Sequence, residues 1–331
     1  MRNRYCFYIL IFLIPFGGSA QLSDIFEDPA AHYREALDLL DKQKYASASD
    51  AFREYLTHNT DKNDEWVVAS HYYIGLCSME LFNDDADELM KYFVRTYPES
   101  PRVNHAYFLL GQYYYRNRDF DEAITWYSQV ETRHIEPDLL PEYNFKFGYA
   151  HLQEDDPDMA LERFAAAMDT ESEYAAPSAY YYAHINYEKK NYQVALERFY
   201  TIQDDPRFGS IVPYYITQIL FIQKKYQEVT EYAPAILDTS KVQKRGETAR
   251  MAGESFFRLK DYENAVVYLE MYEKNATPQR YDKYLLGYSY YQGGDYDKAI
   301  KNFTRVTYMN DSLAQVTYYH LADCYLKQGE K

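Results

Sequence analysis

The stretch that decides the fold is YLLGYSYYQGGDYDKAIKNF, residues 284–303. A Gly-Gly pair at 293–294 separates two halves, and each half has its large apolar residues three or four positions apart. That spacing puts these residues on one face of a helix. The first half carries a small residue at Gly287, and the second carries Ala299 with Phe303 four positions later. The stretch therefore predicts two helices joined by a turn at the glycine pair.

The same arrangement recurs along the chain. A first small residue returns every 34 to 39 residues, at Ala36, Gly75, Gly111, Gly148, Ala183, Thr217, Gly253, Gly287 and Ala322. Twelve residues after most of these comes a second small residue, at Ala48, Ala123, Ala160, Ala195, Val229, Ala265 and Ala299. We expect the two small residues of a hairpin to face each other where its helices cross, so that the backbones approach closely. Repetition with this period predicts an all-α solenoid.

The pattern resembles the tetratricopeptide repeat family. The first small residue corresponds to position 8 of the family's repeat of about 34 residues and the second to position 20, while position 11 is filled by Tyr114, Leu220, Phe256, Tyr290 and Tyr325. The resemblance implies a right-handed superhelical solenoid of tandem helix-turn-helix repeats, with about eight full repeats and a truncated ninth. The second repeat departs from the pattern because Ala86 falls one residue early, and the sixth is degenerate, with Thr217 and Val229 at the small positions.

The repeats predict the domain organisation. A short lead-in occupies residues 21–28, repeats one to six occupy 29–237, a polar linker occupies 238–247, and repeats seven to nine occupy 248–331. The last of these ends at HLADCYLKQGEK, in the first helix of its hairpin, with Tyr318, Leu321 and Tyr325 on its apolar face. Because solenoids end in polar capping elements, we expect further repeats or a partner to complete this hairpin.

The first residues, MRNRYCFYILIFLIPFGGSAQ, predict a secretory signal peptide over residues 1–20. A basic start precedes a short apolar run, and small residues end at Ala20. An uncleaved N-terminal anchor is the alternative. Cys6 precedes the apolar run, which argues against a lipid anchor, and no later run is long enough to span a bilayer. We therefore expect an exported, periplasmic protein with no membrane span after cleavage and with peripheral association to the envelope.

Charge and cysteine content limit the classes of partner and site. The formal net charge is −16, and an acidic chain repels phosphate backbones, so nucleic acid is not an expected partner. Cys77 and Cys324 lie seven repeats apart, too far for a disulfide, and are predicted to be small buried side chains.

The eight histidines are scattered without metal-ligand spacing, and no nucleophile motif occurs. We predict no cofactor, no metal site and no catalytic residue. The acidic runs at 84–85, 155–158 and 204–205 fall at turns, where such residues cap helices or attract a cation or a basic partner.

The resemblance places the inner surface of the solenoid on the first helix of each hairpin. Aromatic side chains dominate its inner positions, and tyrosine, with 40 copies, is the outlier of the composition. The predicted partner-binding groove consists of Tyr72, Phe108, Tyr115, Phe145, Tyr149, Tyr180, His184, Tyr187, Tyr214, Gln218, Arg250, Tyr284, Tyr288 and Tyr291. Tyrosine gives a large, stiff contact with one hydrogen-bonding group, as interfaces favour. The alternative is that these rings pack between neighbouring repeats and belong to the core.

One segment narrows the expected function. RTYPESPRVNHAYFLLGQYYY, residues 95–115, resembles the envelope branch of the family, which includes TolA-binding periplasmic proteins and repeat lipoproteins of outer-membrane assembly. This resemblance implies a non-catalytic scaffold that binds other proteins of the cell envelope. Two alternatives stay open: a targeting or regulatory arm of a longer enzyme or receptor that continues past residue 331, and a glycan-binding groove.

Overall fold

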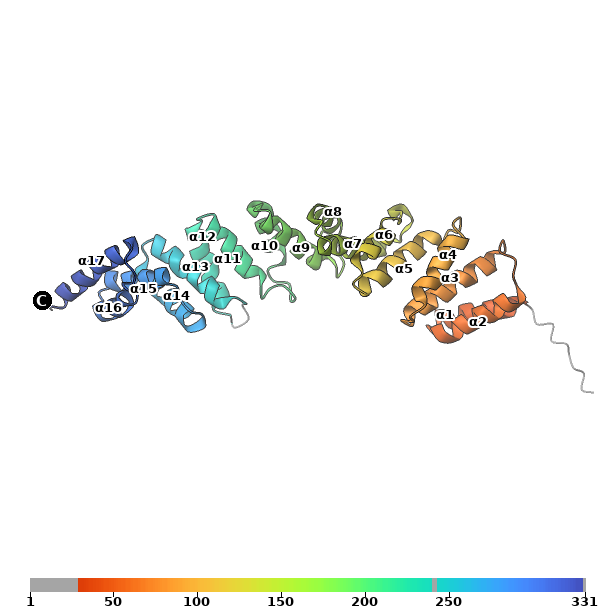
Figure 1. Ribbon diagram of the computed structural model, residues 1–331, viewed down its shortest axis with the longest axis horizontal. Coiled ribbons are helices and arrows are strands. Elements are labelled where there is room, and N and C mark those ends of the chain that lie inside the picture. The colour runs from red at the N-terminus through yellow and green to blue at the C-terminus, as the bar shows by residue number, and fades with distance from the viewer. Residues whose placement is uncertain (1–28, 240–242, 330–331) are drawn as a thin grey trace, which may run out of the picture. The chain divides into compact units, whose positions relative to one another are not determined.

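A computed structural model describes residues 29–239 and 243–329. The predicted signal peptide at 1–20 and the lead-in at 21–28 lie outside the described residues. The chain divides into two compact units, Met1–Leu110 and Gly111–Lys331, and the division falls within α5. Figure 1 shows that the described residues form helices that follow one another in chain order, joined by turns.

The described part of the first unit, from residue 29 on, contains four helices and the start of a fifth. These are α1 (Pro29–Asp41), α2 (Tyr45–His58), α3 (Glu65–Glu80), α4 (Ala86–Thr96) and α5 (Val103–Arg116). The principal helix contacts in this unit join α1 to α2, α2 to α3 and α3 to α4, with a smaller contact between α1 and α3.

The second unit continues the same arrangement. Its helices are α6 (Phe120–Tyr127), α7 (Leu140–Gln153), α8 (Pro157–Ala167), α9 (Ala175–Glu188), α10 (Tyr192–Ile202), α11 (Val212–Ile222), α12 (Tyr226–Leu237), α13 (Arg245–Arg258), α14 (Tyr262–Asn275), α15 (Arg280–Gln292), α16 (Tyr296–Thr304) and α17 (Ser312–Lys327). Two short 3₁₀ helices, η1 (Thr132–His134) and η2 (Pro137–Leu139), precede α7. Each helix packs mainly on its neighbours in sequence, and the hairpins include α7–α8, α9–α10, α13–α14 and α15–α16. The predicted all-α solenoid of helical hairpins is confirmed.

The turn that follows the first helix of each hairpin contains one residue with a left-handed backbone conformation. The residue seven positions after the first small residue has a positive φ, between 55° and 80°, and these residues are Gln43, Phe82, Arg118, Asp155, Lys190, Lys224, Lys260, Gly294 and Gly329. In α13 the turn then closes with a bond from the Asp261 N–H to the Phe256 carbonyl (2.9 Å), and in α15 with one from Asp295 to Tyr290 (3.0 Å). A left-handed residue followed by such a bond ends a helix in the Schellman manner.

The residue after the left-handed position often begins the next helix. The side chains of Asp119, Asp156, Asp261 and Asp295 accept hydrogen bonds from backbone N–H groups three residues on and cap α6, α8, α14 and α16. Pro157 follows Asp156 in the first turn of α8, where its missing N–H costs no helical hydrogen bond. These aspartates therefore end one helix with their backbone and start the next with their side chain.

The close approach within a hairpin differs from the expectation in one respect. A Cβ added to Gly253 would meet Leu269 Cγ at 2.7 Å, and one added to Gly287 would meet the Phe303 ring at 2.9 Å. Opposite these glycines lies the large residue of the second helix, and the second small residue lies four positions earlier. At these two crossings the glycine makes room for a bulky side chain, and that large residue, not the second small residue, supplies the atom nearest to the added Cβ.

The apolar sides of the helices form a core in each unit. Cys77 and Cys324 are buried free thiols, as predicted, and burial raises the pKa of Cys77 to about 11. On α17, by contrast, Tyr318 and Tyr325 are exposed, while Leu321 packs against the core around Phe303.

α13 begins at Arg245, inside the predicted linker, and Gln243 ahead of it donates its backbone N–H to the Ser210 carbonyl (2.8 Å). None of the helices described here combines the length and the apolar character needed to cross a bilayer.

Candidate partner-binding surface

Two of the predicted groove residues belong to the core of the first unit. Tyr72 is 6 % exposed and Phe108 is 2 % exposed. The Tyr72 hydroxyl pairs with His105 Nδ1 at 2.5 Å, and its ring packs edge-on against Phe93. For these two residues the core interpretation holds, because they have almost no surface to offer a partner.

The other predicted residues lie on the first helices of the hairpins in the second unit and are half-buried. We call this set the aromatic stripe: Tyr115, Phe145, Tyr149, Tyr180, His184, Tyr187, Tyr214, Gln218, Arg250, Tyr284, Tyr288 and Tyr291. Half-burial means that each side chain packs on the solenoid with one part and faces solvent with another. The surface and core interpretations therefore both apply to the same rings.

Rings of successive hairpins touch one another along the stripe. Tyr115 on α5 contacts Tyr149 on α7 with ring centroids 5.8 Å apart, and Tyr149 contacts Tyr181 on α9 at 5.4 Å. On the other side of α9, Tyr187 lies 5.4 Å from Tyr215 on α11. These edge-on geometries are the ones that aromatic pairs prefer.

Sequence reasoning missed three residues that connect the stripe. Tyr181 and Tyr215 directly follow the predicted Tyr180 and Tyr214, His320 lies on α17, and each of the three contacts several rings. His320, for example, lies 4.9 Å from Tyr288 and 5.4 Å from Tyr291. The tyrosine doublets Tyr180-Tyr181 and Tyr214-Tyr215 were the available signal, because the second member of each doublet turns toward the preceding hairpin.

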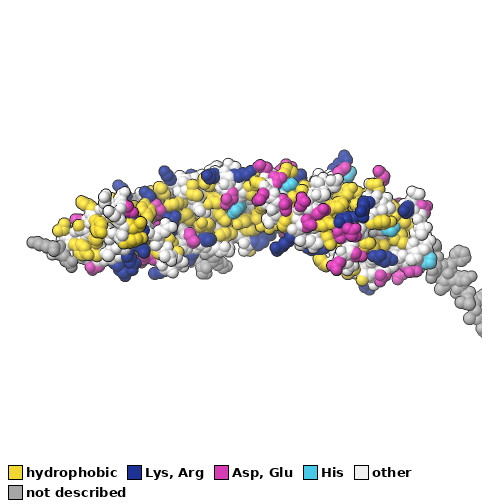
Figure 2. Space-filling model, viewed as in Figure 1, with side chains coloured by type: hydrophobic (Ala, Val, Ile, Leu, Met, Phe, Trp, Pro, Cys, Tyr) yellow, Lys and Arg dark blue, Asp and Glu magenta, His cyan; other side chains and the backbone are white. Residues whose placement is uncertain are grey.

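Two hollows open on the stripe. The α9 hollow measures about 550 Å³ and is lined by Leu152, Pro157, Tyr180, Tyr181, His184, Ile185, Glu188 and Lys189. The α7 hollow measures about 300 Å³ and is lined by Tyr115, Arg116, Arg118, Phe120, Tyr149 and Gln153. Figure 2 shows one face of the molecule, on which hydrophobic side chains reach the surface among acidic and basic ones. Hollows of this size accept individual side chains of a partner.

Burial shifts the pKa values of Tyr180 and His184 toward the neutral form of each side chain. It raises the pKa of the Tyr180 phenol well above its usual value, and the neighbouring Tyr215 adds to this. Burial also lowers the pKa of His184, and the nearby Glu188 only partly opposes that shift. At neutral pH the stripe therefore presents neutral rings that donate and accept hydrogen bonds.

Arg250 is the charged residue within the stripe, and its charge is already balanced. Its guanidinium lies 3.3 Å from Glu254 and 3.7 Å from the buried Asp282 on α15, and Glu254 also pairs with Arg258 at 2.8 Å. Burial raises the pKa of Asp282, which also caps α15 by accepting the Gln279 N–H. This network joins α13 to α15, so Arg250 serves packing between hairpins more than recognition of a free carboxylate.

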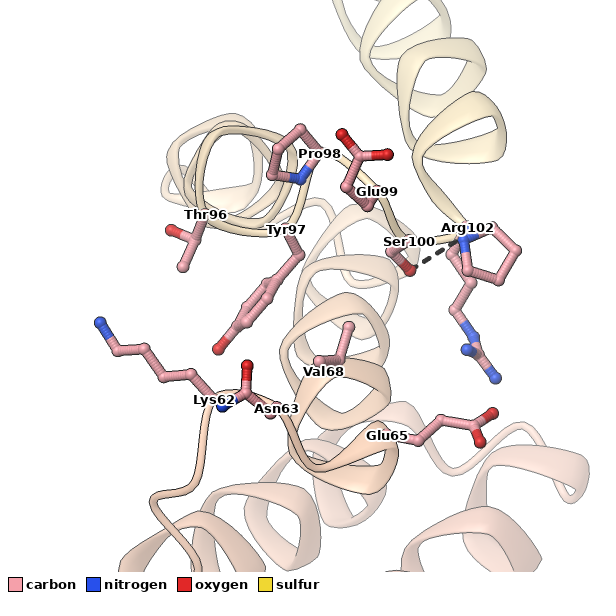
Figure 3. A pocket seen from close by; sticks show the side chains of 11 residues that line it. Lys62, Asn63, Glu65, Val68, Thr96, Tyr97, Pro98, Glu99, Ser100 and Arg102 are labelled. Carbon is pink, nitrogen blue, oxygen red and sulfur yellow. Dashed lines mark hydrogen bonds between the residues drawn. The ribbon is translucent and has the colours of Figure 1, made fainter.

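The first unit has a separate cavity of about 490 Å³ at the loops before α3 and α5 (Figure 3). It is lined by Val68, by the segment from Thr96 to Arg102, and by Lys62, Asn63 and Glu65. Its charges are of both signs, and the Ser100 hydroxyl accepts the Arg102 N–H (3.3 Å) across one wall. Within the described ranges, no three His, Cys, Asp or Glu side chains come together as metal ligands.

Comparison with known families decides what this arrangement is. Residues 82–135 match the model of the tetratricopeptide repeat. This segment of the chain is therefore of tetratricopeptide repeat type. Residues 258–331 match the model of the anaphase-promoting complex, cyclosome, subunit 3. No curated protein matches the chain.

Three solved structures similar to this chain are PilF, RapI and a tetratricopeptide repeat protein. PilF of Pseudomonas aeruginosa is 19 % identical, with 65 % of this chain and 96 % of that chain covered and a TM-score of 0.43. The apo form of RapI is 16 % identical, with 91 % and 99 % covered and a TM-score of 0.48. A tetratricopeptide repeat protein from Parabacteroides merdae is 13 % identical, with 89 % and 98 % covered and a TM-score of 0.40.

Proposed function

We propose that this protein is a non-catalytic tetratricopeptide repeat scaffold of the cell envelope and that the aromatic stripe of its second unit binds a partner protein. The observation that carries the proposal is a series of half-buried rings on successive first helices, with two hollows opening among them. Proteins of this repeat class generally mediate protein–protein interaction, and stacked repeats give the extended surface that this role needs.

The composition of the stripe suits a surface that holds an extended segment of another protein. Rings that pack on neighbouring rings lose little conformational freedom on binding, because their orientation is already restricted. Their half-exposed edges and hydroxyls remain available for contacts with side chains and with backbone. The same rings thus stabilise the solenoid and present a preorganised surface.

The location of this scaffold is part of the proposal. It rests on the predicted signal peptide at residues 1–20 and on the similarity of residues 95–115 to envelope repeat proteins. Both point to export, so the partner we propose is another protein of the periplasm or the envelope.

Site-specific crosslinking in cells tests this function. A photoreactive phenylalanine analogue placed at Tyr187, on the stripe, should give a crosslink to one envelope protein. The same analogue at Tyr200, an exposed tyrosine on the second helix of the same hairpin, is the matched control. Crosslinks from Tyr200 but not from Tyr187 would show that another face binds the partner.

Alanine substitution provides the quantitative test. The triple substitution Tyr180→Ala, Tyr187→Ala and Tyr214→Ala removes three stripe rings and should weaken partner binding by at least about tenfold, since aromatic residues dominate binding energies. Helical content and the unfolding midpoint of the triple variant show whether the solenoid persists. Unchanged partner binding in a folded variant would refute the stripe as the binding surface, and competition by free sugars would favour glycans as the ligand.

A further inference from the structure

The α9 hollow has an apolar floor and an acidic rim. The floor consists of Leu152, Pro157, Tyr181 and Ile185, and the ring of Tyr180 forms one side. Glu188, whose side chain is 65 % exposed, lies at the rim. Such a hollow fits a side chain with a long apolar stem and a charged end.

The charge at this rim is negative and uncompensated. Lys189 also lines the hollow, but it forms an ion pair with Asp158. The nearest basic group to Glu188 is His184 Nε2 at 4.0 Å, and burial lowers the pKa of His184 and keeps it neutral at pH 7. The exposed Glu154 and Asp155 lie in the turn between Leu152 and Pro157 and add to the negative potential.

The stripe elsewhere shows how this chain places cations on its tyrosines. Lys327 Nζ lies 4.6 Å from the centre of the Tyr291 ring and 3.3 Å from Asp323, so one cation meets both a ring and a carboxylate. Lys146 Nζ likewise lies 5.7 Å from the Tyr115 ring and pairs with Glu142. In the α9 hollow the rings and the carboxylate are present, and the lysine that lines it is paired with Asp158 instead.

We propose that the α9 hollow binds an arginine or lysine side chain of the partner, with its stem against Tyr180, Tyr181 and Ile185 and its cation beside Glu188. This inference rests on the proposed function of the stripe and names the residue class that the stripe selects. The attraction of a cation to tyrosine rings and the pairing with Glu188 act together at this point. The α7 hollow, which carries Arg116 and Arg118, has the opposite charge, so the selection is local to α9.

Methyl NMR on the full chain tests the proposal with a small probe, N-acetyl-arginine amide. Leu152 and Ile185 line the hollow, so their methyl signals report its occupation, and Ile219 in the core serves as a silent reference. The uncharged citrulline analogue is the control probe, because it keeps the stem and removes the cation. We expect the arginine probe to shift both lining methyl signals and to bind about three- to tenfold more tightly than the citrulline probe.

Glu188→Gln should reduce this preference at least about twofold, leaving the part that the tyrosine rings supply, whereas Glu263→Gln, an exposed glutamate on α14, should leave it unchanged. Equal shifts with both probes, or an undiminished preference in Glu188→Gln, would overturn the proposal. If the proposal fails in this way while the crosslink from Tyr187 is still formed, the stripe binds a partner, but the α9 hollow does not recognise a cationic side chain of that partner. Loss of the crosslink as well would refute the proposed function itself.

Discussion

At the scale of the residue, the turn of each hairpin depends on one left-handed position. Lys260, between α13 and α14, has a φ of 66°, in a region that side chains with a Cβ avoid. A non-glycine residue there costs about 1 kcal/mol. The cost is tolerated because two hydrogen bonds depend on this conformation: the Asp261 N–H donates to the Phe256 carbonyl, and the Asp261 side chain accepts from the Asn264 N–H. In the hairpin of α15 and α16 the same position is Gly294, which avoids the cost.

We expect Lys260→Gly to stabilise the second unit. Glycine adopts this φ without a steric penalty, and the gain should be about 0.5–1 kcal/mol in the free energy of unfolding, after the larger entropy of the unfolded chain is subtracted. Urea unfolding followed by circular dichroism measures it. The matched control is Lys301→Gly, within α16, which should cost about 1 kcal/mol. A destabilising effect of Lys260→Gly would show that the lysine side chain itself supports the turn.

The buried Asp282 predicts a dependence of stability on pH. Burial raises its pKa in the folded state above the ordinary value for aspartate, so the folded chain holds the proton more tightly than the unfolded chain does. Its contribution therefore favours folding at low pH and is lost as the pH rises through the folded pKa. Asp282→Asn should remove this contribution and change stability at pH 7 by no more than about 1 kcal/mol, since the loss of the pair with Arg250 is offset by removal of a buried charge.

Denaturant unfolding of both proteins between pH 4 and pH 7 provides the measurement. The native protein should lose stability relative to Asp282→Asn as the pH rises over this range. The capping bond is kept in the variant, because an asparagine oxygen can still accept the Gln279 N–H. The opposite slope would mean that the pair with Arg250 dominates over burial.

At the scale of the element, the hairpin is defined by a small residue on one helix and a large one on the other. Their spacing in the sequence predicted the helices, the turns and the buried cysteines, because helical periodicity and small residues act locally along the chain. Which residues face each other was not predictable in this way. The contact of Gly253 with Leu269, and the pairing of Arg250 with both Glu254 and Asp282, depend on how the helices cross in space. The second rings, at Tyr181 and Tyr215, connect hairpins that sequence reasoning treated separately.

Gly253→Ala tests the crossing in α13 and α14. The added methyl would lie 2.7 Å from Leu269 Cγ and 3.0 Å from the Leu269 backbone nitrogen, which cannot move aside as a side chain end does. We expect a loss of about 1–3 kcal/mol in the free energy of unfolding. Gly293→Ala, where the nearest atom to a new Cβ is 3.5 Å away, is the matched control and should change stability by less than about 0.5 kcal/mol. Similar effects of both substitutions would rule out the close contact as the cause.

At the scale of the whole molecule, the helices that contact each other are close together in the sequence. The principal contacts of each helix are with the next helix or the next but one, as in α13 with α14 and α15. Stability in such a chain is a sum of hairpin terms and nearest-neighbour terms. The extended stripe is a consequence of the same arrangement, because each hairpin adds one set of rings to the surface.

This arrangement predicts that a destabilising substitution loosens only the helices near it. In Gly253→Ala, amide hydrogen exchange should accelerate in α11 to α16, whose contacts with the altered crossing are direct or pass through one neighbour. Exchange in α1 to α4 should stay at the native rate, because those helices belong to the other compact unit. Hydrogen exchange read out by mass spectrometry resolves these segments, and the Gly293→Ala variant gives the baseline. Acceleration over the whole chain would instead show that the solenoid unfolds as a single cooperative body, and the stripe would then have to be treated as one indivisible surface rather than as a series of hairpin sites.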